Sequence, residues 1–138
     1  MIRFQRGASA AAFVVIATAF GSVHAEDLSG YSGAQLYQRF CASCHGADGL
    51  GDGPVASSLK VMVPDLAHLA KRHGGTFPSE QVRRIIDGLE TRPPHGPRDM
   101  PVWGLEFRAA AADDPQASVR ADELITKLVK FLRSIQRE

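Results

Sequence analysis

The chain is poor in cysteine, lysine and aromatic residues, and it has no excess of either sign of charge. Two cysteines in 138 residues exclude a framework of several disulfides. Sixteen basic residues stand against 15 acidic ones, which does not give the clearly basic face that nucleic-acid-binding proteins usually have. No apolar run reaches the roughly 20 residues that a membrane-spanning helix needs. Only four residues are lysines: Lys60, Lys71, Lys127 and Lys130.

The first 25 residues have the pattern of a secretory signal peptide. Arg3 and Arg6 form a positive start, an apolar run follows from Ala8 to Phe20, and small residues precede Ala25. This pattern predicts export with cleavage after Ala25. An uncleaved membrane anchor is the alternative, but the apolar run is short for a spanning helix.

Both cysteines lie in one short motif, Cys-Ala-Ser-Cys-His at residues 41–45. A C-x-x-C-H run indicates covalent attachment of a c-type haem. The thiols of Cys41 and Cys44 can each form a thioether to the macrocycle, and the adjacent His45 can bind its iron. The next residues, 46–54, contain four glycines and a proline and are predicted to form a loop.

The chain after cleavage would form one small domain, residues 26–138, with a formal charge of −1 because two arginines leave with residues 1–25. Three of the ten aromatic residues leave as well, and seven are few for a core of this length. A buried haem would supply the missing apolar mass.

Two other uses of the cysteines compete with haem. A thioredoxin-like pair would begin a helix after a strand, whereas this pair follows a predicted helix. A zinc site could combine Cys41 and Cys44 with His68 and His73, but 23 residues separate the two pairs, more than in the usual zinc finger. Zinc would also leave the adjacent His45 unexplained.

Apolar periodicity and helix-end signals predict an all-α chain. Ser32, Ser79 and Ser118 are plausible N-caps, and Gly88 is a plausible helix terminator. A single helical turn is expected between residues 56 and 63. The predicted helices are residues 34–40, 65–73, 80–87, 105–112 (in part) and 118–137.

From about Gly33 to Arg133 the chain resembles the class I c-type cytochromes. That family places a glycine and an aromatic residue eight and four positions before the first cysteine, as Gly33 and Tyr37 stand here. The pair contacts the C-terminal helix, where this chain has Leu128 and Phe131. The resemblance implies a small class I cytochrome c fold, with about four to five short helices packed around one covalent haem.

The resemblance also implies roles around the haem. Cys41 and Cys44 would carry it, and His45 would be one axial ligand of the iron. The carbonyl of Pro64 would accept a hydrogen bond from the His45 ring, which fixes the ring and its basicity. Leu66 would lie against the haem.

Met100 is the predicted second axial ligand, because a methionine followed by a proline after a rigid loop is how the family presents it. Met62 and His95 are competitors, while His68 and His73 are expected on a helix surface. A thioether ligand favours reduced iron and raises the potential.

Two further residue types are candidates for haem contacts. The indole of Trp103 could donate to a haem propionate, or it could be a packed core aromatic. Arg98 and Arg92 lie along the loop that leads to the methionine and could pair with propionates, although solvated arginine is the alternative for at least one of them.

Together these features predict a periplasmic electron-transfer protein, an electron carrier rather than an enzyme, acting with redox partner proteins such as a dehydrogenase, reductase or terminal oxidase. It would be a monomer or a subunit of a complex. The alternatives are a dedicated electron-accepting subunit of an oxidoreductase, of the sulfur-oxidising or dehydrogenase type, and a haem gas sensor or peroxidatic enzyme if Met100 does not bind iron. The few lysines give no assurance of docking through a ring of lysines, and Asp113-Asp114 has no counterpart that we can place in the family.

Overall fold

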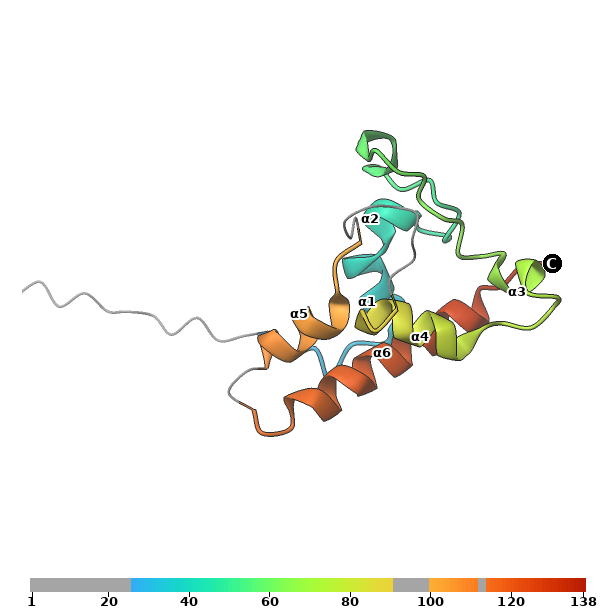
Figure 1. The fold of residues 1–138 in the computed structure, drawn as a ribbon. Coiled ribbons are helices and arrows are strands. Elements are labelled where there is room, and N and C mark those ends of the chain that lie inside the picture. The colour runs from blue at the N-terminus through green and yellow to red at the C-terminus, as the bar shows by residue number, and fades with distance from the viewer. Residues whose placement is uncertain (1–25, 91–99, 112–113) are drawn as a thin grey trace, which may run out of the picture.

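The computed structural model describes residues 26–90, 100–111 and 114–138, and in these ranges the chain is helical with no strand. Figure 1 shows the helices as a cluster with a loop projecting on one side. The prediction of an all-α fold is confirmed. The elements are α1 (Gly33–Phe40), α2 (Ala42–His45), a 3₁₀ turn (Ala56–Ser58), α3 (Leu69–Arg72), α4 (Ser79–Asp87), α5 (Trp103–Ala110) and α6 (Ala117–Ser134).

Helix α1 begins at a reciprocal cap and ends at the first cysteine. The Ser32 hydroxyl accepts from the Gln35 backbone N–H, and the Gln35 side chain accepts from the Ser32 N–H. Cys41 closes α1, donating its N–H to the Tyr37 carbonyl at 2.9 Å, and it also precedes α2. This break at Cys41 is one reason why the described residues contain six α-helices and not four to five.

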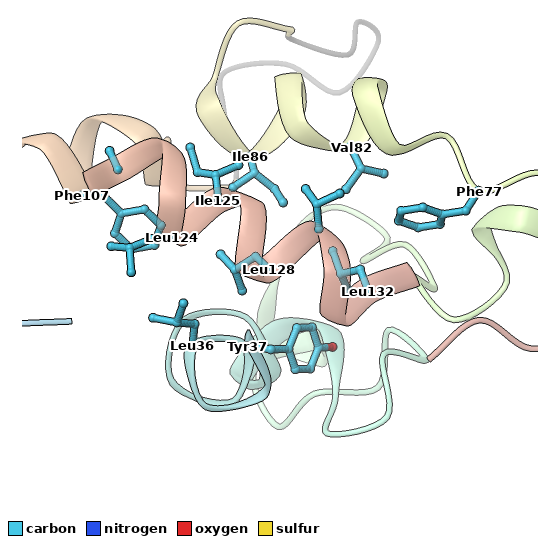
Figure 2. Close-up of a cluster of buried hydrophobic side chains, with 12 residues drawn as sticks. Leu36, Tyr37, Phe77, Val82, Ile86, Phe107, Leu124, Ile125, Leu128 and Leu132 are labelled. Carbon is cyan, nitrogen blue, oxygen red and sulfur yellow. The ribbon is translucent and has the colours of Figure 1, made fainter. Parts of the chain in front are cut away.

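Helix α6 is the centre of the fold, because α1, α4 and α5 all pack on it. Figure 2 shows Leu36 and Tyr37 of α1 on one side of α6 and Val82 and Ile86 of α4 on the other. The buried side chains of α6 recur at the spacing of one apolar helix face. They are Ala121, Leu124, Ile125, Leu128, Val129 and Leu132.

The crossing of α1 and α6 depends on a glycine. A Cβ atom on Gly33 would lie 2.2 Å from the Lys127 carbonyl oxygen and 3.0 Å from the Phe131 Cβ. The Tyr37 and Phe131 rings lie next to this point, with centroids 5.1 Å apart. The expected contact of Gly33 and Tyr37 with the C-terminal helix is therefore confirmed.

Three predicted helix starts were wrong because other groups take the capping position. Pro78 precedes α4 and its carbonyl accepts from the Val82 N–H, so Ser79 is the first helical residue and not the cap. Gln116 precedes α6 and its carbonyl accepts from the Arg120 N–H, so α6 begins at Ala117, one residue ahead of Ser118.

At the third start, the carboxylate of Asp65 accepts from the N–H groups of Ala67 and His68 and forms a turn. Only Leu69–Arg72 of the expected helix 65–73 is then helical. Gly88 does end α4, in the left-handed conformation with φ of 79°.

None of the helices within residues 26–90, 100–111 and 114–138 combines the length and apolarity needed to cross a membrane.

We expect Gly33→Ala to lower the free energy of unfolding by about 1–3 kcal/mol, because the new methyl group would meet backbone atoms of α6 that cannot move aside cheaply. Urea denaturation of the haem-loaded protein measures this. Gly30→Ala is the matched control, since a Cβ there has nothing within 4 Å. Equal midpoints for the two variants would show that α1 and α6 do not cross this closely.

Candidate haem site

His45 is the buried polar residue at the centre of the site. It is the last residue of α2, and 9% of its surface is exposed. Its Nδ1 lies 3.0 Å from the carbonyl oxygen of Pro64. A carbonyl can only accept, so Nδ1 carries the proton and Nε2 keeps its lone pair. This is the tautomer that a metal-binding imidazole requires.

Burial also keeps the imidazole of His45 uncharged. Removal from water lowers the pKa of His45 below its usual range, while the hydrogen bond to Pro64 opposes the shift. A neutral ring is the form that binds metal ions.

The two thiols stand one turn apart beside this histidine. Cys41 and Cys44 are both free and half-buried, and the Cys44 N–H donates to the Cys41 carbonyl at 3.1 Å. Burial, helped by the neighbouring Cys44, raises the pKa of Cys41 to about 12. Cys41 is therefore held as an uncharged thiol.

The glycine-rich loop wraps the end of α2, as its turn chemistry predicted. Gly51 and Gly53 donate their N–H groups to the carbonyls of His45 and Cys44, at 2.8 and 3.1 Å. These bonds satisfy carbonyls that the end of a helix leaves free. A Cβ on Gly53 would lie 2.4 Å from the Ser43 oxygen, and one on Gly51 would lie 2.6 Å from the Val63 oxygen. Only glycine permits such a close approach on both sides.

Tyr37 links the core to this loop. Its ring packs on α6, and its hydroxyl donates to the Gly46 carbonyl at 2.7 Å. Burial raises the pKa of Tyr37 well above its usual value, so the hydroxyl keeps its proton. The sequence predicted that the Tyr37 ring contacts the C-terminal helix. It did not predict the hydrogen bond of the hydroxyl, because no local pattern shows that the Gly46 carbonyl, nine residues later, folds back to Tyr37.

The Pro64-Asp65-Leu66 segment completes the histidine side of the site. Leu66 is half-buried against the core cluster, and its N–H donates to the Gly49 carbonyl at 2.6 Å. The Asp65 carboxylate holds the next turn of the chain and also lies 2.7 Å from the His68 ring. The acceptor of His45 thus belongs to a segment with fixed hydrogen bonds on either side.

Met100 lies three residues before α5, and Trp103 is the first residue of α5. Met100 is half-buried and packs against the core cluster, whereas Met62 is 91% exposed on the loop after the 3₁₀ turn. The Trp103 ring packs with Phe40 at 5.2 Å and with Phe107 at 6.2 Å between centroids. Trp103 is therefore a core aromatic, whatever its indole N–H contacts. Arg98, Arg92 and His95 lie outside the described residues.

The described residues do not bring together the proposed zinc ligands. No group of three or more His, Cys, Asp or Glu side chains in these ranges could hold a metal ion. The ring of His68 is paired with Asp65, and His73 Nδ1 lies 2.8 Å from the Leu69 carbonyl.

The donor set fits a haem instead. Two free thiols one turn apart and a neutral, oriented imidazole are the groups that a covalently attached haem needs, and they share one short stretch of backbone. A family model described as cytochrome c matches residues 31–136. The chain belongs to the cytochrome c family. Neither the curated proteins nor the solved structures gave a match to it.

Membership of the family establishes the cofactor and the general task. A cytochrome c carries a covalently bound haem c, and the haem iron serves in electron transfer with redox partners. The family suggests an electron carrier and not an enzyme.

We expect Tyr37→Phe to destabilise the protein by about 0.5–1.5 kcal/mol, since the buried Gly46 carbonyl would lose the Tyr37 hydroxyl and keep only the Gly49 N–H, 3.2 Å away. Tyr31→Phe is the control: its hydroxyl donates to Glu26 at an exposed position, and its loss should cost no more than about 0.5 kcal/mol. Urea denaturation compares the two. A larger loss for Tyr31→Phe would contradict the role given to Tyr37.

Proposed function

We propose that this cytochrome is a periplasmic one-electron carrier in which Cys41 and Cys44 hold the haem and His45 and Met100 are its axial ligands. The haem, when bound, supplies the one-electron couple, and the protein supplies attachment, orientation and burial. Its partners would be redox proteins that deliver and accept single electrons. Residues 1–25 would direct export and be removed.

The observation that carries the proposal is the hydrogen bond from His45 to Pro64. A neutral imidazole can donate from either ring nitrogen, and its acceptor decides which nitrogen keeps the lone pair. Here the Nδ1–H of His45 donates to the Pro64 carbonyl, and the residues around Pro64 are fixed by other hydrogen bonds. Nε2 is therefore the nitrogen that can bind iron.

Burial supports Met100 as the second ligand. A thioether that binds iron has to leave bulk water, and Met100 packs against the core while Met62 is 91% exposed. With both axial positions filled, no coordination position remains for a substrate. This favours electron transfer over gas sensing or peroxide chemistry.

We expect one covalently held haem per chain when the protein is produced with a haem-ligation system. The haem should remain with the protein in acidified organic solvent, because thioether bonds survive that treatment. Replacing both Cys41 and Cys44 by alanine should release all the haem, while Ser43→Ala, an exposed change between them, should release none. Extractable haem from the wild-type protein would contradict covalent attachment.

We expect Met100→Ala to remove the weak far-red sulfur-to-iron band, admit carbon monoxide to the ferrous protein and lower the potential. Loss of the thioether removes a ligand that favours ferrous iron. The ferrous-to-ferric ratio should fall at least tenfold, about 59 mV for one electron. Met62→Ala is the control and should change none of these. A wild-type protein that lacks the band and binds carbon monoxide readily would point to a sensor or peroxidatic enzyme.

A further inference from the structure

Pro64 accepts the hydrogen bond of His45, and the residues that follow Pro64 are bonded by a glutamine just beyond α6. The side-chain amide of Gln136 donates to the carbonyls of Leu66 and Leu132, at 2.8 and 2.7 Å. Its oxygen accepts from the Ala70 N–H at 2.8 Å. One half-buried side chain thus uses its donors and its acceptor to join α6 to residues 66–70.

Backbone bonds strengthen this connection. The Arg137 N–H donates to the Ala67 carbonyl at 2.7 Å, and the N–H groups of Leu66 and Ala67 donate to the Gly49 carbonyl at 2.6 and 3.1 Å. Residues 66 and 67 are therefore bonded to the glycine-rich loop on one side and to the end of α6 on the other. Figure 1 shows the C-terminal end of the chain beside α3, the helix just after this segment.

The direction of the Pro64 carbonyl depends on the residues after Pro64. The ring of proline fixes φ, so the remaining freedom of Pro64 is its ψ angle, which turns the carbonyl relative to the next residues. Those residues are fixed from Leu66 onward by Gln136. On the other face, Gly51 lies against the Pro64 peptide, since a Cβ there would be 3.3 Å from the Pro64 carbonyl carbon.

We propose that Gln136 is a positioning residue that holds the Pro64 carbonyl toward His45 and thereby sets the basicity of the imidazole. The inference rests on the proposed function, in which His45 binds the haem iron. A carbonyl that accepts strongly from Nδ1–H makes the imidazole a more basic ligand. A more basic ligand stabilises ferric iron, so weakening this hydrogen bond raises the potential.

The test compares Gln136→Met with Gln81→Met in the haem-loaded protein. Methionine is close to glutamine in length and cannot make the three hydrogen bonds. Gln81 is also half-buried, but its side chain donates to Glu90 at 3.0 Å and forms no hydrogen bond with the described residues 64–70. Gln136→Ala is a second variant, for the case that methionine packs poorly. The measurements are the midpoint potential and, by NMR, the solvent exchange of the His45 Nδ1–H proton.

Both Gln136 variants should raise the ferrous-to-ferric ratio at fixed potential at least threefold, about 28 mV for one electron, and speed exchange of the Nδ1–H proton at least tenfold. Gln81→Met should change neither. A potential equal to that of the wild-type protein overturns the proposal, even if the denaturation midpoint falls, because the role would then be structural only.

The wild-type protein separates failure of this inference from failure of the proposed function. If His45 binds the ferric iron, its ring resonances are shifted strongly by the unpaired electron. Their absence overturns the ligand assignment and the inference with it. Shifted resonances combined with unchanged Gln136 variants overturn the inference alone.

Discussion

A buried imidazole has two nitrogens to satisfy, and the arrangement of this site depends on how His45 satisfies the first. Its Nδ1–H requires an acceptor that does not move, and Pro64 provides one 3.0 Å away. Because Pro64 lies 19 residues further along the chain, the intervening loop has to return to α2 within hydrogen-bonding distance. The glycines at 51 and 53 permit that return, since a larger residue at either place would collide with backbone.

The position of the His45 acceptor also depends on the helical core. Tyr37 joins the loop to α1 and α6, and Gln136 joins the segment after Pro64 to the end of α6. Helix α6, which provides half of the buried residues of the apolar core, therefore also determines where the loops of the site lie. Stability and the geometry of the histidine are coupled in this chain, because one helix serves both.

Sequence reasoning predicted the features that depend on local pattern. The all-α class, the cap at Ser32, the apolar face of α6 and the glycine-rich loop each have signals within a few residues, and the structure agrees with them. The contact of Gly33 with α6 came from the family resemblance. Helix starts were less predictable: α4 and α6 begin without a side-chain cap, after Pro78 and Gln116, so the capping preference of Ser79 and Ser118 did not mark their first residues. The family resemblance implied the hydrogen bond of His45 with Pro64, 19 residues away. Other long-range hydrogen bonds could not be predicted, because a pairing such as that of Gln136 with Leu66 exists only after α6 has packed. The roles of His45 and Met100 toward iron remain predictions, supported by burial and by the orientation of the His45 ring.

The connection between distant parts of the chain has a consequence for the order of maturation. Lys127 bonds the carbonyl of Ser29, 98 residues earlier, and Gln136 bonds the carbonyl of Leu66, 70 residues earlier. Closing such long loops is entropically costly, so these bonds form only once α6 has been synthesised and has packed. Burial in the folded chain raises the pKa of Cys41 to about 12, which makes its thiol less reactive than the exposed thiol of an unfolded chain.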